Sequence, residues 1–170
     1  MTGMMGSGKT AVGSAVARRL DVPFVDSDHE IERAADRSIA EIFARDGEAF
    51  FRARETQVLS RLLDGPPAVL STGGGAWLSP ANREMIAGRG LSIWLSVELE
   101  ILWARVRQKD TRPLLRTPDP KGTLAELLAE RSPIYALADL EVEAEPGLSV
   151  DGMADKVIGA LSRRGTVNGE

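Results

Sequence analysis

The sequence contains no cysteine and only one histidine among its 170 residues. The absence of cysteine excludes disulfide bonds and thiolate metal sites. No apolar run approaches the roughly 18 residues of a membrane span. The N-terminus also lacks the basic region and apolar run of a secretory signal. We therefore expect a cytoplasmic protein without a membrane partner, and we interpret His29 as a surface residue.

The chain also lacks an excess of positive charge, since its formal net charge is −4. This balance argues against general affinity for nucleic acid. An anionic ligand must then be bound by locally placed arginines and backbone amides. With 43% hydrophobic and 27% charged residues, the composition is typical of a globular protein. We predict a monomer with a single domain over residues 1–162 and a flexible tail over 163–170.

Residues 3–10 match the pattern Gly-x-x-x-x-Gly-Lys-[Ser/Thr] of a phosphate-binding loop. In such a loop the glycines turn backbone N–H groups inward, the Lys reaches the terminal phosphates of a nucleotide, and the hydroxyl ligates Mg²⁺. Val12, Val16 and Leu20 then share one helical stripe, so the loop opens a helix. The pattern predicts nucleotide contacts from Gly3, Gly6, Ser7, Gly8, Lys9, Thr10 and Ala11, with Thr10 also a metal ligand.

Only Met1 and Thr2 precede this loop, although a phosphate-binding loop normally follows a buried strand. A central strand of about five apolar residues would contribute ~8–15 kcal/mol at ~1.5–3 kcal/mol for each side chain. That sum matches the ~5–15 kcal/mol stability of a whole domain. We therefore expect either that the reading frame starts upstream of Met1 or that the chain as given is poorly stable.

Short apolar segments alternate with helical patterns along the rest of the chain. Strands are expected near residues 22–25, 68–72, 91–95 and 140–144, and the helices between them predict a parallel sheet with helices on both faces. Asp46-Gly47 should interrupt a long helix, whereas Ser38 and Thr123 should each open one as the first residue of a capping box. The polar, proline-bearing residues 110–122 between two such elements are the candidate for a mobile lid.

Polar residues follow two of the expected strands. Asp26 and Asp28 follow the first, and the triple glycine Gly73–Gly75 follows the next. In parallel sheets ligands bind at the carboxyl ends of the strands, so these residues should lie near the phosphate-binding loop. The alternative for the two aspartates is a strand-end turn in which Asp28 caps the next helix.

Taken together, six segments carry a resemblance to the shikimate kinase family. It spans nearly the whole chain in one order, through the phosphate-binding loop and the runs at residues 24–28, 47–52, 72–75, 112–115 and 130–135. The resemblance implies a three-layer P-loop kinase fold of the α/β class, with a central parallel sheet, helices on both faces and a lid. It implies transfer of the ATP γ-phosphoryl group to the 3-hydroxyl of shikimate, with Mg²⁺. Ala11 departs from the second hydroxyl residue that many relatives carry.

The resemblance also implies roles for individual residues. Lys9, Asp28 and Arg112 would be catalytic: Lys9 and Arg112 on the phosphates, and Asp28 on the reacting hydroxyl. Asp26 would support Mg²⁺ together with Thr10. Arg105 would contact the nucleotide, although Arg107 leaves that register open. The substrate-binding residues would be Asp28, Phe51, Arg52, Gly73, Gly74, Gly75 and Arg131, with Arg52 and Arg131 on the carboxylate, Phe51 against the ring and Glu55 holding Arg52.

Two other functions remain open. Another small-molecule kinase of the same fold, such as a gluconate kinase, would share the loop and the lid but would not need the pair Arg52 and Arg131. A truncated nucleotide-binding module would bind nucleotide without turnover.

Overall fold

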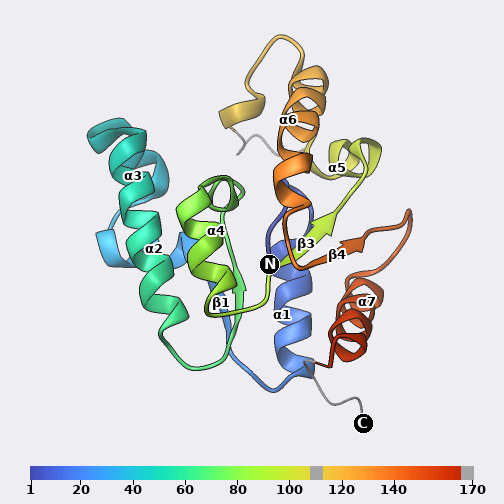
Figure 1. Ribbon diagram of the computed structural model, residues 1–170. Coiled ribbons are helices and arrows are strands. Elements are labelled where there is room, and N and C mark those ends of the chain that lie inside the picture. Colours follow the sequence, from blue (N-terminus) through green and yellow to red (C-terminus); the bar gives the residue numbers. More distant parts are fainter. Residues whose placement is uncertain (108–112, 166–170) are drawn as a thin grey trace.

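The computed structural model describes residues 1–107 and 113–165. Helices surround short parallel strands, and the first and last helices, α1 and α7, pack side by side (Figure 1). In chain order the elements are α1 (Lys9–Arg19), β1 (Phe24–Asp26), α2 (Ser27–Ala35), α3 (Ile39–Leu63), β2 (Val69–Ser71), η1 (Ala76–Leu78), α4 (Pro80–Ala87), β3 (Ile93–Ser96), α5 (Leu99–Val106), η2 (Pro113–Leu115), α6 (Pro120–Tyr135), β4 (Leu140–Glu143) and α7 (Val150–Arg163).

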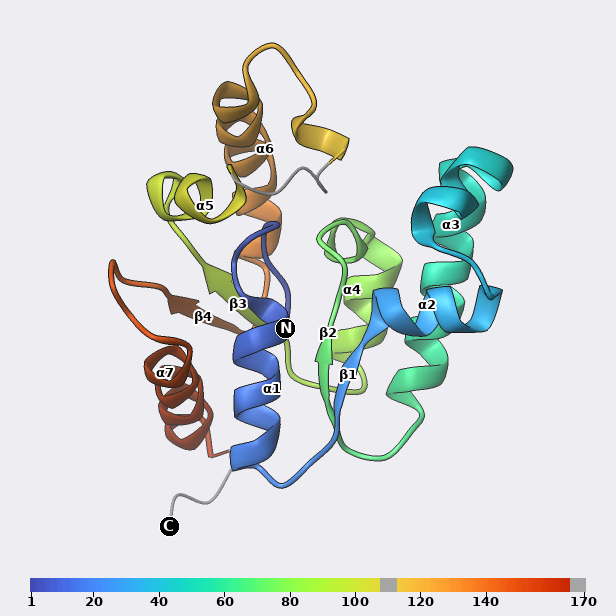
Figure 2. The same cartoon turned by 180° about the vertical axis from the view of Figure 1, so that it is seen from behind.

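The strands form two parallel pairs, β1 with β2 and β3 with β4. The first residues of the chain lie between the pairs (Figure 2). Thr2 makes a parallel bridge to Trp94, with its N–H 2.8 Å from the Ile93 carbonyl. On the other side, the Met1 carbonyl accepts a hydrogen bond from the Thr72 N–H at 3.1 Å. Residues 1–2 therefore connect the pairs in the order β1-β2-(1–2)-β3-β4.

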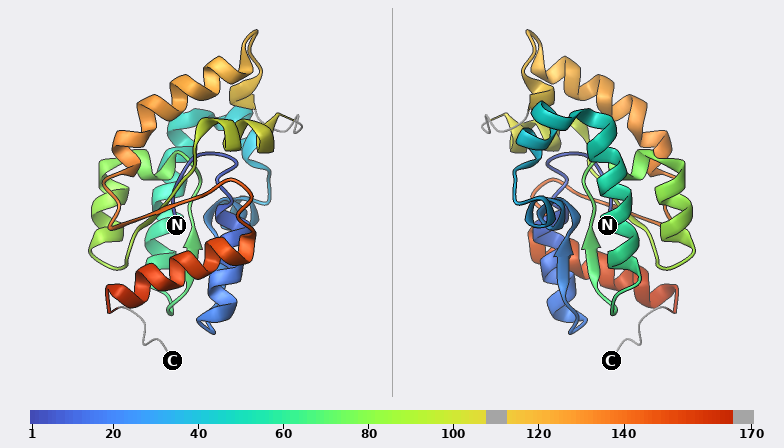
Figure 3. Two further views of the ribbon diagram at one scale, coloured as in Figure 1. Left: turned by 90° about the vertical axis from the view of Figure 1, so that its right-hand side faces the viewer. Right: turned by 90° about the vertical axis from the view of Figure 1, so that its left-hand side faces the viewer.

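Helices cover both faces of these strands, with α1 and α4 on opposite sides (Figure 3). The main core includes Val16 of α1, Leu95 of β3, Leu102 of α5 and Val157 of α7, and all four side chains are buried. Burial from both faces explains the continuous apolar run of β3, whereas β4 alternates, with Glu141 and Glu143 exposed. The predicted α/β architecture is confirmed.

An apolar groove of about 590 Å³ lies beside the first two residues. Val16, Val69 and Ile93 are among the side chains that line it. The low stability that the sequence leads us to expect stays a prediction.

Local signals placed several element boundaries correctly. Ser38 and Glu41 form the predicted capping box at the start of α3. Gly47 interrupts that helix with φ 83° and ψ 171°, a backbone conformation that glycine adopts without a steric penalty. The predicted break at Asp46-Gly47 is therefore confirmed.

Three predicted boundaries need correction. The helix expected to open at Thr123 begins at Pro120, because the Asp119 side chain caps it by accepting a hydrogen bond from the Gly122 N–H at 3.0 Å. Residues 120–122 of the expected lid are therefore helical, and residues 110–112 lie outside the described residues. The domain boundary at 162 is too early, because α7 continues to Arg163 and the Arg164 guanidinium binds the Asp139 carboxylate at 3.2 Å. Within the described parts of the chain, no helix is long and apolar enough to cross a membrane.

Candidate active site

A cleft of about 680 Å³ opens at the carboxyl ends of β1 and β2, above the start of α1. The phosphate-binding loop forms one wall, and residues from both strand ends form another. This cleft gathers most of the residues that the sequence singled out: Gly6, Ser7, Gly8, Lys9, Thr10, Ala11, Asp26, Asp28, Gly73, Gly74, Arg105 and Arg131.

The loop has the backbone conformation that phosphate binding needs. Gly6 and Gly8 have φ values of 78° and 91°, and Gly8 is the N-cap of α1. Positive φ values at these positions direct successive N–H groups into the loop, and the helix N-terminus adds its partial positive charge. The Ser7 hydroxyl is buried and has no hydrogen-bond partner among the described residues. The loop thus has the backbone conformation and the N-terminal charge that suit an anionic ligand.

Two cations lie against this loop. The Lys9 ammonium donates hydrogen bonds to the carbonyls of Gly3 at 2.8 Å and Met4 at 3.0 Å. From α5, the Arg105 guanidinium donates to the Gly6 carbonyl at 3.1 Å. Because Arg105 lines the cleft and Arg107 does not, the structure favours the Arg105 register that the sequence left open.

Thr10 and Asp26 face each other across the start of α1. The Thr10 hydroxyl donates to one Asp26 carboxylate oxygen at 3.3 Å. The other oxygen accepts from the Asp28 N–H at 2.9 Å and the His29 N–H at 3.3 Å. Asp26 rather than Asp28 therefore caps α2, so the alternative in which Asp28 is the cap is wrong.

The pair of Thr10 and Asp26 fits Mg²⁺ by its chemistry. A hydroxyl and a carboxylate are hard oxygen ligands, and Mg²⁺ takes one or two carboxylates together with water and substrate phosphates. The described residues hold no group of three or more His, Cys, Asp or Glu side chains that could ligate a metal. The residues present thus suit a metal that is shared with a phosphate ligand.

Asp28 lies on the opposite wall, directed at the triple glycine. A β-carbon on Gly73 would lie only 2.6 Å from its Oδ1 atom. The pKa of Asp28 is raised, first by burial and next by the Asp26 carboxylate, while Lys9 acts in the opposite direction. A carboxylate with a raised pKa in a cleft is suited to accept a hydrogen bond or a proton from a ligand.

Arg52 on α3 reaches the triple glycine from another side. Its Nη1 donates to the Glu55 carboxylate at 2.9 Å, and its Nη2 lies 3.5 Å from that of Glu48. Burial raises the pKa of Glu55, while the Arg52 guanidinium lowers it. Glu55 is 1% exposed, so it holds the guanidinium from the protein side. The predicted role of Glu55 as the holder of Arg52 agrees with this geometry.

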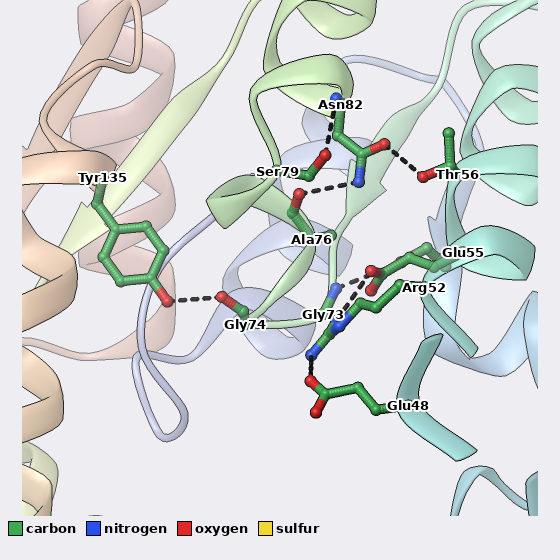
Figure 4. Close-up of polar contacts among 11 residues, drawn as sticks. Glu48, Arg52, Glu55, Thr56, Gly73, Gly74, Ala76, Ser79, Asn82 and Tyr135 are labelled. Carbon is green, nitrogen blue, oxygen red and sulfur yellow. Dashed lines mark hydrogen bonds and ion pairs between the residues drawn. The ribbon is translucent and has the colours of Figure 1, made fainter. Parts of the chain in front are cut away.

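Charged side chains gather around the triple glycine, and Figure 4 shows Arg52 and Glu55 near Gly73 and Gly74. A β-carbon on Gly75 would lie 2.5 Å from Arg52 Nη2, and one on Gly74 would lie 3.9 Å from Arg131 Nη1. Asp28 occupies the same position relative to Gly73. One turn of three glycines is therefore surrounded by a carboxylate and two guanidinium groups, and a β-carbon at Gly73 or Gly75 would displace its neighbour.

One predicted site residue of the described chain, Phe51, stands apart from this arrangement. Phe51 is 3% exposed and packs with Ile31, Ile42 and Val58 between α2 and α3. The structure thus places Phe51 in a core rather than in an open wall of the cleft, and its contact with a ligand ring stays a prediction. Arg112 lies outside the described residues.

The sequence did not predict a set of hydrogen bonds that supports the triple glycine from behind. The Thr56 hydroxyl donates to the Asn82 side-chain oxygen at 2.8 Å, and the Asn82 amide donates to the Ala76 carbonyl at 3.0 Å. On the other side, the Tyr135 hydroxyl donates to the Gly74 carbonyl at 2.7 Å. Two of these contacts join residues 26 and 61 positions apart in the chain, and no local motif predicts them.

Replacing Gly75 with alanine should weaken acceptor binding without weakening the fold. Gly75 has ordinary φ and ψ values of −89° and −17°, so alanine costs no backbone strain. Its β-carbon would instead displace the end of the Arg52 side chain. We expect the KM for the acceptor to rise about tenfold, the scale of one lost hydrogen bond to a charged group, with Tm unchanged.

The matched control is Gly159→Ala in α7, where a β-carbon would meet only Arg163 Nη1 at an ordinary 3.5 Å. This variant should keep the KM of the parent. Equal KM values for the two variants would show that Gly75 is not needed for the placement of Arg52.

Comparison with known proteins gives matches from one family. The family model for shikimate kinase matches residues 5–162. The shikimate kinase of Cereibacter sphaeroides is 63% identical over 164 residues, which are 96% of this chain and 82% of that protein. The shikimate kinase of Ruegeria pomeroyi is 61% identical, covering 96% of this chain and 84% of that protein.

Solved structures place the fold in the same family. A shikimate kinase from Acinetobacter baumannii in complex with shikimate superposes with a TM-score of 0.89 at 38% identity, covering 96% of this chain and 91% of the other. A gluconokinase from Sinorhizobium meliloti gives a TM-score of 0.60 at 17% identity, covering 96% and 90%. The second likeness extends to the fold alone.

Proposed function

The chain belongs to the shikimate kinase family, and from this premise we propose that it transfers the γ-phosphoryl group of ATP to the 3-hydroxyl of shikimate, giving shikimate 3-phosphate and ADP. The observation that carries the proposal is the single cleft with a phosphate-binding loop at one wall and Asp28 and Arg131 at the other. Phosphoryl transfer depends mainly on positioning and charge stabilisation. The loop and the residues at the strand ends would provide the positioning and the charge stabilisation.

At the nucleotide wall, the loop amides and Lys9 would bind the phosphates of ATP. Lys9 donates to loop carbonyls, and phosphate oxygens would offer it a stronger, charged acceptor. Arg105 would support the loop through the Gly6 carbonyl. Arg112, from the expected lid, is proposed to add positive charge at the transferred group.

Thr10 and Asp26 are the residues that would hold Mg²⁺. The ion would supply charge neutralisation at the phosphate oxygens. Asp26 contributes further as the cap of α2, because its carboxylate orders the backbone at Asp28. A change at Asp26 would therefore affect both the metal and the position of the acceptor aspartate.

At the acceptor wall, Asp28 would accept a hydrogen bond from the reacting hydroxyl and take its proton as the new P–O bond forms. Arg52 and Arg131 would bind the shikimate carboxylate, for which a planar guanidinium offers paired donors. Backbone N–H groups of Gly74 and Gly75 would complete the contact. The acceptor would thus be held at its carboxylate end while its hydroxyl points to the phosphate.

A gluconate kinase and a nucleotide-binding module without turnover are the competing functions. A coupled ADP-release assay at fixed Mg-ATP, with shikimate and gluconate as acceptors, separates the three. We expect ADP release that depends on shikimate and not on gluconate. Release with gluconate alone, or nucleotide binding without release with either acceptor, would overturn the proposal.

We also propose that the protein acts as a monomer in the cytoplasm, with no nucleic-acid or membrane partner. The support is that one chain supplies every described wall of the cleft, together with the net negative charge. Sedimentation at micromolar concentration would test the monomeric state.

A further inference from the structure

Tyr135, the last residue of α6, is fully buried behind the triple glycine. Its hydroxyl donates to the Gly74 carbonyl at 2.7 Å (Figure 4). Its ring stacks on Trp94 of β3, with centroids 6.1 Å apart and an interplanar angle of 27°. A second hydrogen bond runs in parallel, from the Trp77 indole N–H to the Ile134 carbonyl at 2.9 Å. The end of α6 is therefore fixed to the segment that carries the triple glycine.

The bond to the Gly74 carbonyl sets the direction of a peptide plane. In a trans peptide the carbonyl and the following N–H point in opposite directions. With its carbonyl held by Tyr135, the Gly74–Gly75 peptide must direct the Gly75 N–H away from Tyr135. Within the described residues, neither the Gly74 nor the Gly75 N–H donates a hydrogen bond. Both amides therefore remain available to an anionic ligand.

Arg131, one helical turn earlier on α6, lies beside the same glycine. A β-carbon on Gly74 would lie 3.8 Å from the Tyr135 hydroxyl and 3.9 Å from Arg131 Nη1. The Arg131 guanidinium lowers the pKa of Tyr135, but burial has the larger effect and raises it. Tyr135 thus stays protonated near neutral pH. It can donate to the Gly74 carbonyl. The Tyr135 hydroxyl therefore holds the backbone turn at the place where the Arg131 guanidinium lies.

We propose that Tyr135 is a positioning residue for the carboxylate of the acceptor: by fixing the Gly74 carbonyl beside Arg131, it holds one guanidinium and the Gly75 amide in a single binding arrangement. The inference rests on the proposed function, because it assumes a carboxylate acceptor. Tyr135 itself is buried and does not touch the substrate. Its effect should therefore appear in acceptor binding rather than in the chemical step.

Tyr135→Phe removes only the hydroxyl and keeps the ring against Trp94. We expect the KM for shikimate to rise about tenfold, with kcat changed less than about threefold and the KM for ATP unchanged. The matched control is Ser92→Ala. It removes another largely buried hydroxyl, which donates to the Asp139 carboxylate at 2.7 Å, and it should leave both KM values unchanged.

A second measurement does not depend on the folding of a variant. Tyr135 is the only tyrosine in the sequence, so biosynthetic 3-fluorotyrosine gives one fluorine resonance from this site. We expect shikimate to shift that resonance with a midpoint equal to its dissociation constant, and gluconate to leave it unchanged. A purely structural tyrosine would show no saturable shift.

The outcomes separate the two claims. If the wild type releases no ADP with shikimate, the proposed function fails and this inference fails with it. If the wild type is active but Tyr135→Phe keeps the shikimate KM of Ser92→Ala, or the fluorine resonance does not respond, only the inference is overturned. Equal rises in both KM values would also contradict it, because they would indicate general loosening of the fold.

Discussion

Replacing Asp28 with asparagine is expected to lower kcat by about 100- to 1,000-fold, the range for loss of one positioned acid–base group. Asparagine is close in size and can still receive a hydrogen bond through its oxygen, but it cannot take a proton or carry negative charge. Nucleotide binding should be retained, because the loop that binds the phosphates forms the opposite wall of the cleft. The measurement is steady-state turnover together with the dissociation constant for ADP.

The same substitution should raise stability at neutral pH. The folded-state pKa of Asp28 is raised, chiefly by burial, so the ionised carboxylate costs free energy in the fold. For an acid with a raised pKa, that cost appears as pH increases from the unfolded-state pKa through the folded-state pKa. We therefore expect the Asp28→Asn variant to have a higher Tm than the wild type at pH 7, with the difference shrinking as pH falls.

These two readouts test Asp28 jointly. If Asp28 is a catalytic carboxylate whose burial lowers stability, its replacement by asparagine should lower turnover and raise Tm. Wild-type turnover in the Asp28→Asn variant would contradict the catalytic assignment. Lower Tm with lower turnover would indicate that Asp28 mainly supports the fold.

Replacing Arg131 with alanine is expected to raise the KM for shikimate by at least about 100-fold, since bonds between a guanidinium and a carboxylate are among the strongest polar contacts. The guanidinium lies beside Gly74 and lines the cleft. The KM for ATP should change little, because the nucleotide wall comes from the loop and α5. The measurement is initial rate against each substrate in turn.

Two further variants sharpen the test of Arg131. Arg131→Lys should recover only part of the affinity, because an ammonium lacks the paired donors of the guanidinium. Arg19→Ala removes an arginine at the far end of α1 that pairs with Asp151 at 3.0 Å, and it should leave both KM values unchanged. If Arg131→Ala and Arg19→Ala behave alike, Arg131 does not bind the acceptor.

Local rules predicted the parts of the site that depend on short segments. The phosphate-binding loop, the aspartates at the end of β1 and the triple glycine after β2 each follow from a motif or from a strand end. Their convergence follows from the parallel sheet, because carboxyl ends of parallel strands meet at one edge. This explains how residues as distant as Thr10, Asp28 and Gly74 could be assigned to one cleft before their positions were known.

The parts that sequence did not predict have physical causes. Asp119 and Thr123 are both suitable N-cap residues. Asp119 caps α6, so the helix begins at Pro120, one turn before the start that Thr123 predicts. Phe51 shares a helical face with the buried Val58, and both follow the non-helical Gly47, so the helical period favours burial of Phe51, whereas its expected place against a ligand ring came from the resemblance alone. Tyr135 and Asn82 act through contacts across 61 and 26 residues, and no sequence rule of short range reports such contacts.

The central claim is that this cleft phosphorylates shikimate at its 3-hydroxyl. The most direct measurement is the phosphorus NMR spectrum of a reaction containing the protein, Mg-ATP and shikimate. We expect ADP and one new phosphate monoester to appear in equal amounts, with the ester phosphorus coupled to the proton at carbon 3. A spectrum showing only ADP and inorganic phosphate, or an ester at another hydroxyl, would contradict it.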